Sequence, residues 1–325
     1  MRARRHAMIP GVRVGHATDA IGCTGCTVIL PDAPAVGGLE IAGRAAGVHG
    51  IEFLDPRHVA PHVDAVVLSG GSAFGLESIW GVMEVLEARG RGFAVGKTVV
   101  PHVAGAIIFD LNVGDHRARP DRAMGRRACE AAAPGPVAEG SVGAGTGATV
   151  GKLHRVERAM RGGIGCAVLE ADGLAVSALM VVNAVGDVRD PASGRLIAGA
   201  RDAPDGRRLV DTAAALAAGA RLGGFAPVNT TIGCVVTSAA LTKPEAARVA
   251  ALGIDGFARA LSPPHLPSDG DALFCLSVGD RRADVAAVGA LAATAVARAI
   301  VRAVEMATPL PGLPTARDLA RGVGS

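Results

Sequence analysis

Residues 223–237 read Gly-Gly-Phe-Ala-Pro-Val-Asn-Thr-Thr-Ile-Gly-Cys-Val-Val-Thr, a glycine- and proline-containing linker that ends where a β-rich run begins. The run 231–237 is dominated by β-branched side chains, a composition that predicts a buried strand. Thr230 therefore places a hydroxyl group at the start of a buried strand, directly after a flexible linker. Because threonine begins many strands for steric reasons, this stretch taken alone favours an ordinary structural role.

The peptide bond between Asn229 and Thr230 carries the alternative, chemical hypothesis. The Thr230 hydroxyl is placed to attack the carbonyl group that precedes it. If that bond breaks, Thr230 gains a free α-amine, whose ordinary pKa of about 7.7–8.0 leaves part of it unprotonated near neutral pH. The amine can then take the proton of the hydroxyl on the same residue, which is one route to an activated threonine.

Strand and helix patterns alternate along the rest of the chain. A capping box, Thr242 to Glu245 with Pro244 between them, predicts the start of a helix that buries Val249, Gly253 and Phe257. Residues 187–206 are polar and rich in glycine, proline, aspartate and arginine, so we expect a surface loop or linker there. The other expected strands are 63–68, 95–101, 165–169, 174–182 and 273–278, and the other expected helices are 73–88, 209–218 and 284–306. With no composition break, we expect a single mixed α/β domain with largely buried sheets.

Composition excludes several classes of function. The 325 residues are half apolar and carry a net charge of only +3, with eight aromatic residues and no tyrosine, so we expect no nucleic-acid partner. The longest uncharged apolar run, 285–297, is too short to span a bilayer, and we expect no membrane partner. No apolar stretch of signal-peptide length follows the N-terminal arginines, and the six cysteines suit a reducing compartment, so we expect the cytoplasm.

The sequence offers no convincing metal or cofactor site. Cys23 and Cys26 form a Cys-x-x-Cys pair that no second pair completes, and His58 and His62 have a proline between them. The glycine-alternating segment 141–151 lacks the spacing of a phosphate-binding loop, so close backbone packing or amides that line a pocket are the better interpretation. We therefore expect no cofactor and no metal.

Seven stretches in a fixed order, from about residue 8 to about residue 307, change the weight of the chemical hypothesis. Together they resemble the P1 family of peptidases, which includes L-aminopeptidase/D-esterases, β-aminopeptidases and endo-type nylon-oligomer hydrolases. The stretches are 11–16 (GVRVGH), 68–75 (LSGGSAFG), 108–111 (IFDL), 143–152 (GAGTGATVGK), 229–233 (NTTIG), 241–243 (LTK) and 268–271 (SDGD).

The resemblance implies an α-β-β-α sandwich of the N-terminal-nucleophile type, matured by self-cleavage between Asn229 and Thr230. Fragments 1–229 and 230–325 would remain together as one structural domain. Thr230 would be the nucleophile and its α-amine the general base. The resemblance also assigns Asp269 and Asp271 to the acidic pair that orients this amine, Asn183 to the group that holds the oxyanion, and Lys152 to a lysine beside the nucleophile.

Each implied role has a physical sense and a simpler alternative. Asp269 and Asp271 are two positions apart, so both side chains leave the same face if the segment is extended, but an Asp-Gly-Asp turn would serve structure alone. Asn183 follows a predicted buried strand and could point at a tetrahedral oxygen, or could satisfy a turn. Lys152 could stabilise the oxyanion or lower the pKa of the Thr230 amine, or could be a solvated surface lysine.

The chain departs from the aminopeptidase pattern in ways that affect the expected substrate. Several aminopeptidases use a tyrosine near the oxyanion, and they carry serine and glutamate where this chain has Asp269 and Asp271. The set found here is closer to the nylon-oligomer hydrolases. The sequence thus predicts a hydrolase of amide, peptide or ester bonds in small substrates, and by resemblance a homo-oligomer, as a tetramer. An acyltransferase acting through acyl-Thr230 and an uncut, non-catalytic binding protein remain the alternatives.

Overall fold

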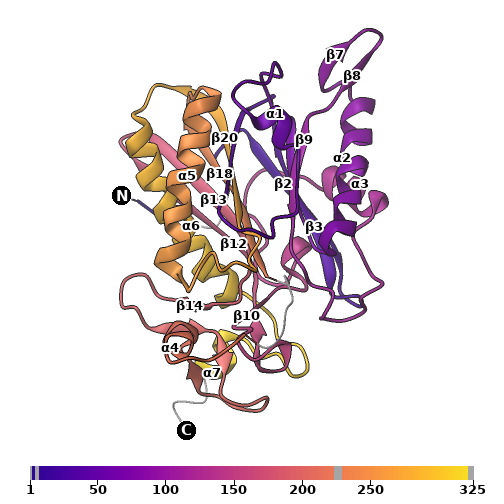
Figure 1. Ribbon diagram of the computed structural model, residues 1–325. Helices are drawn as coiled ribbons and strands as arrows, with labels where there is room; N and C mark the ends of the chain where they lie inside the picture. The colour runs from indigo at the N-terminus through magenta and orange to yellow at the C-terminus, as the bar shows by residue number, and fades with distance from the viewer. Residues whose placement is uncertain (1, 4–6, 223–228, 321–325) are drawn as a thin grey trace.

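The structure is a computed structural model that describes residues 2–3, 7–222 and 229–320. Two β-sheets form its centre (Figure 1). The six-stranded sheet has the order β1-β12-β13-β18-β20-β4, and the five-stranded sheet has the order β2-β3-β6-β9-β5. The first contains β1 (Arg2–Ala3), β4 (Val36–Ile41), β12 (Gly163–Ala171), β13 (Leu174–Asn183), β18 (Thr230–Ala239) and β20 (Ala272–Arg281); the second contains β2 (Val12–Asp19), β3 (Thr24–Pro31), β5 (Val48–His49), β6 (Ala65–Ser69) and β9 (Val103–Ile107).

Helices cover the outer face of each sheet. Helices α5 (Lys243–Ala260) and α6 (Val285–Glu305) pack against the six-stranded sheet, and α2 (Glu77–Ala88) and α3 (Arg122–Glu130) pack against the five-stranded sheet. Figure 1 shows these pairs on opposite sides of the molecule. Between the sheets, Val66 and Leu68 share one apolar core with Val181, Ile232 and Phe274. The mixed α/β prediction is confirmed, and the layers follow from burial of one apolar face by each element.

The strongest local signals of the sequence correspond to the elements beside the site. The hairpin β12–β13 turns at Asp172 and Gly173, both with positive φ. The capping box forms as predicted. The Thr242 side chain accepts the backbone N–H of Glu245, and the Glu245 carboxylate accepts the backbone N–H of Thr242. α6 is long and apolar enough to cross a membrane by length and composition, but half of it is buried and it packs on α5, β12 and β13, as the core helix of a globular fold does.

The prediction for residues 187–206 is wrong in part: residues 191–195 and 204–205 are exposed, but the segment is not a continuous surface loop. This segment contains the short strands β14 (Asp187–Arg189), β15 (Leu196–Ala198) and β16 (Ala200–Arg201), and it lies in the lower part of Figure 1. Asp187 is fully buried and accepts hydrogen bonds from the backbone N–H groups of Ala200 (2.8 Å) and Thr212 (2.7 Å). A polar composition predicted solvent exposure because it could not show that this carboxylate satisfies buried backbone donors.

The remaining elements are short and connect the layers. The predicted helix 209–218 is β17 (Leu209–Val210) followed by α4 (Thr212–Ala217), and the predicted strand 95–101 is a hairpin of β7 (Phe93–Val95) and β8 (Thr98–Val100). The others are α1 (Ile51–Leu54), β10 (Thr149–Val150), β11 (Met160–Arg161), β19 (Leu261–Ser262), α7 (Ala316–Ala320) and three 3-10 turns, at Ser72–Leu76, Gly143–Gly145 and Val156–Arg158. The linker residues 223–228 lie outside the described residues.

Candidate active site

The ends of three neighbouring strands meet at one place in the six-stranded sheet. β13 ends at Asn183, β18 begins at Thr230, and β20 begins directly after Asp271. Asn183 lies opposite Thr230 in the antiparallel pair, and Asn229 forms a bridge with Asp269. All five side chains are buried, with exposed fractions of 4% or less. The structure thus brings together residues that lie far apart in the sequence.

The carbonyl oxygen of Asn229 accepts two hydrogen bonds. The Thr230 hydroxyl donates one at 2.6 Å, and the backbone N–H of Gly270 donates the other at 2.9 Å. Gly270 must be a glycine here, because a Cβ atom would lie 2.7 Å from Thr230 Oγ1 and 2.6 Å from the Ala45 carbonyl oxygen. The peptide bond before Thr230 is therefore polarised by a fixed backbone donor while a hydroxyl contacts the same oxygen.

Asp269 and Asp271 lie on either side of Gly270, whose N–H binds this peptide bond. Asp271 Oδ1 accepts the backbone N–H of Thr231 at 2.7 Å. Asp269 Oδ2 accepts the N–H of Leu266 at 2.8 Å, while Asp269 Oδ1 is buried without a hydrogen-bond partner. Burial, and then the nearby Asp271, raise the pKa of Asp269 to about 7. One of the two acids is therefore poised to exchange a proton near neutral pH.

Residues 269–271 do not form the Asp-Gly-Asp turn that was the structural alternative. They run beside residues 42–45, whose backbone N–H groups donate to the carbonyl oxygens of Asp269 and Asp271 at 3.0–3.1 Å. A Cβ atom on Gly43 would lie 2.2 Å from the Asp269 carbonyl oxygen, so this support depends on close backbone approach. The sequence carried no signal for the contribution of residues 42–45.

Asn183 is held in one orientation by its neighbours. Its Oδ1 accepts hydrogen bonds from Lys152 Nζ (2.9 Å) and from the N–H (3.0 Å) and hydroxyl (3.4 Å) of Thr149. Its Nδ2 donates to the carbonyl oxygen of Phe109 at 3.0 Å. Three donors on one side fix which end of the amide is the oxygen. The nitrogen end is consequently the donor end of this amide.

Lys152 is not a solvated surface lysine. Its ammonium group donates to the Thr149 carbonyl oxygen (3.1 Å) as well as to the Asn183 carbonyl oxygen (2.7 Å) and side chain. Burial lowers the pKa of Lys152 to about 7, against the opposing effect of Asp269, Asp271 and Asp110. A cation that can lose its proton near neutral pH therefore lies among the acids of the site.

Asp110 is a buried acid of this region to which the sequence assigned no role. It follows β9 within the quoted stretch 108–111, and its oxygens accept from the Thr24 hydroxyl and the Gly71 N–H, both at 2.7 Å. Burial raises the pKa of Asp110. This position of Asp110 accounts for the glycine at position 70 in the neighbouring stretch 68–75, because a Cβ on Gly70 would lie 2.2 Å from Asp110 Oδ2. The segment 143–151 likewise packs on the five-stranded sheet, where Thr18 and Thr27 accept its N–H groups.

Buried polar atoms without partners concentrate at this site. Of the nine such side-chain atoms among the described residues, five belong to it: Asn229 Oδ1, Thr231 Oγ1, His265 Nε2, Ser268 Oγ and Asp269 Oδ1. Each orphaned buried group costs about 1–3 kcal/mol, so their gathering in one place calls for a functional reason. In the part of the chain that the structure describes, no group of three or more His, Cys, Asp or Glu residues could hold a metal ion, and all six cysteines are buried free thiols.

Comparisons with known proteins identify the family of this chain. The sequence profile of peptidase family S58 matches residues 7–317. An uncharacterized aminopeptidase of Mycobacterium tuberculosis is 39% identical, over 97% of both chains. A 6-aminohexanoate-oligomer endohydrolase of a Kocuria species is 34% identical, over 83% of this chain and 74% of that enzyme.

Two solved structures share the fold. A β-aminopeptidase of a Burkholderia species matches with a TM-score of 0.69 and 24% identity, covering 100% of this chain and 96% of that one. The L-aminopeptidase D-Ala-esterase/amidase of Ochrobactrum anthropi, described as a variant of the Ntn hydrolase fold, matches with a TM-score of 0.71 and 18% identity over the same shares.

Proposed function

The chain belongs to peptidase family S58 and is a hydrolase of the peptidase and amidase class, and from this premise we propose that it cuts itself between Asn229 and Thr230 and then uses Thr230 as its nucleophile. The observation that carries the proposal is the polarised carbonyl of Asn229, which contacts the Thr230 hydroxyl at 2.6 Å and the Gly270 N–H at 2.9 Å. The fold is that of the N-terminal-nucleophile enzymes.

Self-cleavage begins with the hydroxyl of Thr230. Its oxygen attacks the Asn229 carbonyl carbon, Asp269 accepts the hydroxyl proton, and the Gly270 N–H stabilises the negative oxygen. The C–N bond then breaks, the departing nitrogen takes up the proton, and an ester joins Asn229 to the Thr230 side chain. Water hydrolyses this ester, which leaves a carboxyl group on Asn229 and both an amine and a hydroxyl group on Thr230.

Cleavage would resolve the electrostatic imbalance of the uncut site. Asp269 carries an unpaired buried oxygen next to Asp271, and Lys152 is the buried lysine that opposes the two acids. The new α-amine of Thr230 adds a cation where these carboxylates lie. In its neutral form the amine accepts the hydroxyl proton of Thr230, so the nucleophile and base come from one residue.

Asn183 and Lys152 supply the electrophilic side of the site. When Thr230 attacks a substrate carbonyl, the oxygen becomes negative, and a preorganised amide donor and a buried cation both stabilise it. Because Lys152 and Thr149 fix the oxygen end of Asn183, the donor requires no reorganisation during the reaction. The acyl-Thr230 ester then reacts with water to release the acid and restore the hydroxyl.

The substrate class that we favour is the linear amide. The 34% identical relative is named for the hydrolysis of 6-aminohexanoate oligomers, and the 39% identical one is named an aminopeptidase. This chain contains no tyrosine, and Asn183 is bound through its amide nitrogen to the backbone carbonyl oxygen of Phe109. We propose short aliphatic amide oligomers and amino-acid amides as substrates.

Mass spectrometry of the purified protein tests self-cleavage directly. The proposal expects two fragments of about 23 and about 10 kDa, the 229/325 and 96/325 shares of the 32.4 kDa chain, with the smaller one beginning Thr-Thr-Ile-Gly. These fragments should accompany release of amine from aminohexanoate oligomers or amino-acid p-nitroanilides. An intact chain that turns over these substrates at full rate would overturn the nucleophile assignment. Product transfer to added amino acids instead of water would indicate acyltransferase chemistry.

A further inference from the structure

His265 joins the carboxylate of Asp271 to the loop that precedes β20. Its ring atom Nδ1 lies 2.8 Å from Asp271 Oδ2, and its backbone N–H donates to the same oxygen at 3.2 Å. Because an ionised carboxylate only accepts, the ring nitrogen is the donor. Asp271 Oδ1 is thereby left for the Thr231 N–H. The two oxygens thus link His265, on one side, to the residue that follows Thr230, on the other.

The loop that carries His265 also holds the second acid. Asp269 Oδ2 accepts the N–H of Leu266, and the Asp269 N–H donates to the Leu266 carbonyl oxygen, both at 2.8 Å. One end of the loop is therefore bound to Asp271 and the next residue is bound to Asp269. The separation and orientation of the two carboxylates depend on this single turn of chain.

His265 occupies a costly conformation. Its φ of 54° lies in the left-handed region, which few residues other than glycine adopt, although histidine, asparagine and aspartate do so more often than most. Its ring packs against the Phe257 ring, with centroids 5.3 Å apart, and its buried Nε2 has no hydrogen-bond partner. Backbone strain combined with an orphaned polar atom persists where the surroundings require the residue for a function.

We propose that His265 is a positioning residue of the proposed reaction, which holds Asp271 against the Thr231 N–H so that Thr230 is aligned with Asp269. The inference rests on the proposed function and extends it to a residue outside the acid pair. His265 does not touch the scissile peptide bond in the contacts above. It acts through Asp271, and its alignment serves both self-cleavage and turnover.

Electrostatics gives this role a measurable signature. Asp269 faces Asp271, Lys152 and His265, and the His265 ring lowers the pKa of Asp269 against the raising effects of burial and Asp271. Removal of the ring therefore raises the pKa of Asp269. If the reaction needs this carboxylate ionised, the rate of a variant without the ring should begin to fall on acidification at a higher pH than the rate of the wild type.

Two substitutions separate the side-chain donor from the backbone strain. Both His265→Asn and His265→Gly tolerate the left-handed conformation, but only asparagine retains an N–H donor at the place of Nδ1. We expect His265→Gly to lower kcat by about 10- to 100-fold, the range seen for residues that orient metal ligands, with KM within about twofold. His265→Asn should recover kcat to within about threefold, and His116→Gly, at an exposed histidine, should match wild type.

The measurement uses full-length protein, with active sites counted by N-terminal sequencing for Thr230 and kcat followed from pH 5 to 9. Equal kcat per active site in the glycine and wild-type proteins, or equal losses in the glycine and asparagine variants, would overturn the inference while the proposed function stands. If wild type is active without being cut, the proposed function fails, and the kcat ratio of the uncut variants decides the role of His265 in the same way.

Discussion

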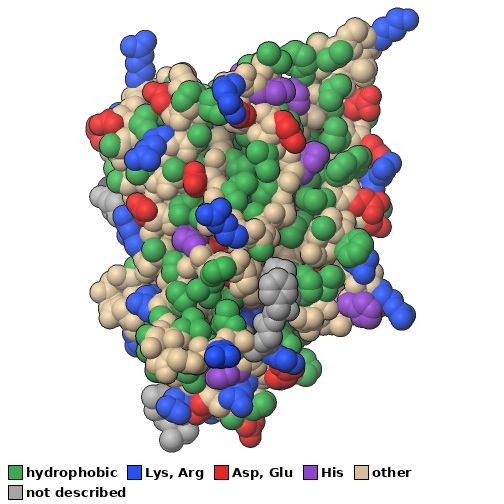
Figure 2. Space-filling view, viewed as in Figure 1, with side chains coloured by type: hydrophobic (Ala, Val, Ile, Leu, Met, Phe, Trp, Pro, Cys, Tyr) green, Lys and Arg blue, Asp and Glu red, His purple; other side chains and the backbone are tan. Residues whose placement is uncertain are grey.

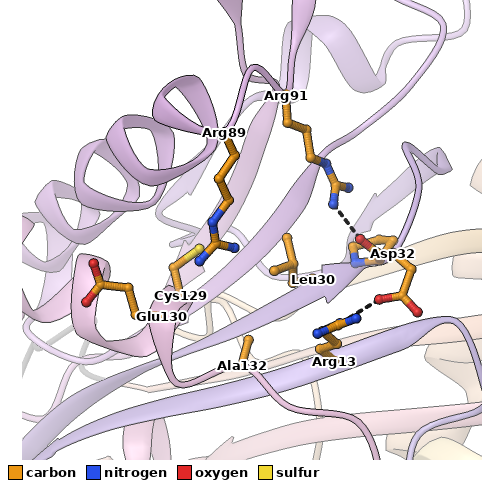
Figure 3. A pocket seen from close by; sticks show the side chains of 9 residues that line it. Arg13, Leu30, Asp32, Arg89, Arg91, Cys129, Glu130 and Ala132 are labelled. Atoms are coloured by element: carbon orange, nitrogen blue, oxygen red, sulfur yellow. Dashed lines mark hydrogen bonds and ion pairs between the residues drawn. The ribbon is translucent and has the colours of Figure 1, made fainter.

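Two regions of the molecule gather charged side chains, and they differ in how those charges are satisfied. A pocket of about 350 Å³ between β2, β3 and the ends of α2 and α3 is lined by three arginines and two acids (Figure 3). There Arg13 pairs with Asp32 at 2.6 Å, and Arg91 donates to the Pro31 carbonyl oxygen at 2.6 Å. At the Asn229–Thr230 peptide, by contrast, buried oxygens lack partners.

The difference teaches that the number of charges does not identify a reactive site. Arg13 binds a carboxylate oxygen and Arg91 binds carbonyl oxygens, near two helix C-termini, where cations are stabilising. On the face shown in Figure 2, basic and acidic side chains are likewise interspersed instead of forming a field of one sign. Charged side chains with hydrogen-bond partners stabilise the fold, whereas buried polar groups without such partners can still react.

The largest expected effect comes from removal of the hydroxyl itself. Thr230→Ala should leave the chain uncut and lower amide hydrolysis by about 10³-fold or more, because no oxygen is left to attack. Thr230→Ser retains the hydroxyl and should still be cut. Intact-mass spectrometry and turnover of an amide oligomer measure both. A Thr230→Ala chain found cut after residue 229 would contradict the assignment.

Two substitutions, each of which replaces an aspartate by uncharged asparagine, test the contrast between the two regions. Asp269→Asn removes the proton acceptor and should slow self-cleavage by about 10²- to 10³-fold. Asp32→Asn breaks an exposed ion pair in the arginine-lined pocket, and it should change the free energy of unfolding by less than about 1 kcal/mol and the cleavage rate not at all. Comparable losses of cleavage in the two variants would remove the distinction drawn above.

The same contrast applies to the basic residues. Lys152→Met should lower kcat by about 10²-fold, because the Asn183 amide loses a donor and the oxyanion loses a cation. Arg91→Met removes bonds to Pro31 and Asp64 and should lower the free energy of unfolding by about 1–3 kcal/mol with kcat unchanged. Urea denaturation and steady-state kinetics distinguish the outcomes. The contrast fails if Lys152→Met affects stability alone.

The last expected effect is a dependence on pH. Since the pKa of Asp269 is raised to about 7, its carboxylate is protonated below that value. Self-cleavage of freshly synthesised chain should rise about tenfold per pH unit up to about 7 and then level off. The effect of pH on stability has the opposite sign. Because the pKa of Asp269 is raised in the folded, uncut chain, protonation of Asp269 stabilises that fold at low pH. This stabilisation is lost as the pH rises through about 7. A cleavage rate that stays flat from pH 5 to 9 would contradict the role of Asp269.

The candidate site was predicted unevenly, and the reason is physical. Asn183, Asp269 and Asp271 were expected from the family resemblance, and the structure places all three at strand ends, where hydrophobic patterns stop. His265 lies in a proline-rich loop without periodicity, and nothing in its neighbours announces the bond to Asp271. Asp110 lay inside a quoted motif, yet its partner Thr24 is 86 positions away.

The sequence by itself determined the alternation of strands and helices, the capping box at Thr242 and the Asn229–Thr230 peptide at the head of a strand, because these depend on neighbours a few positions apart. Only the tertiary structure decided that Gly270 donates to the Asn229 carbonyl, that residues 42–45 support the acid pair and that residues 187–201 contain three short strands. Those features depend on hydrogen bonds between distant segments. Such bonds leave no period in the chain, since one backbone N–H is chemically like any other until folding places it.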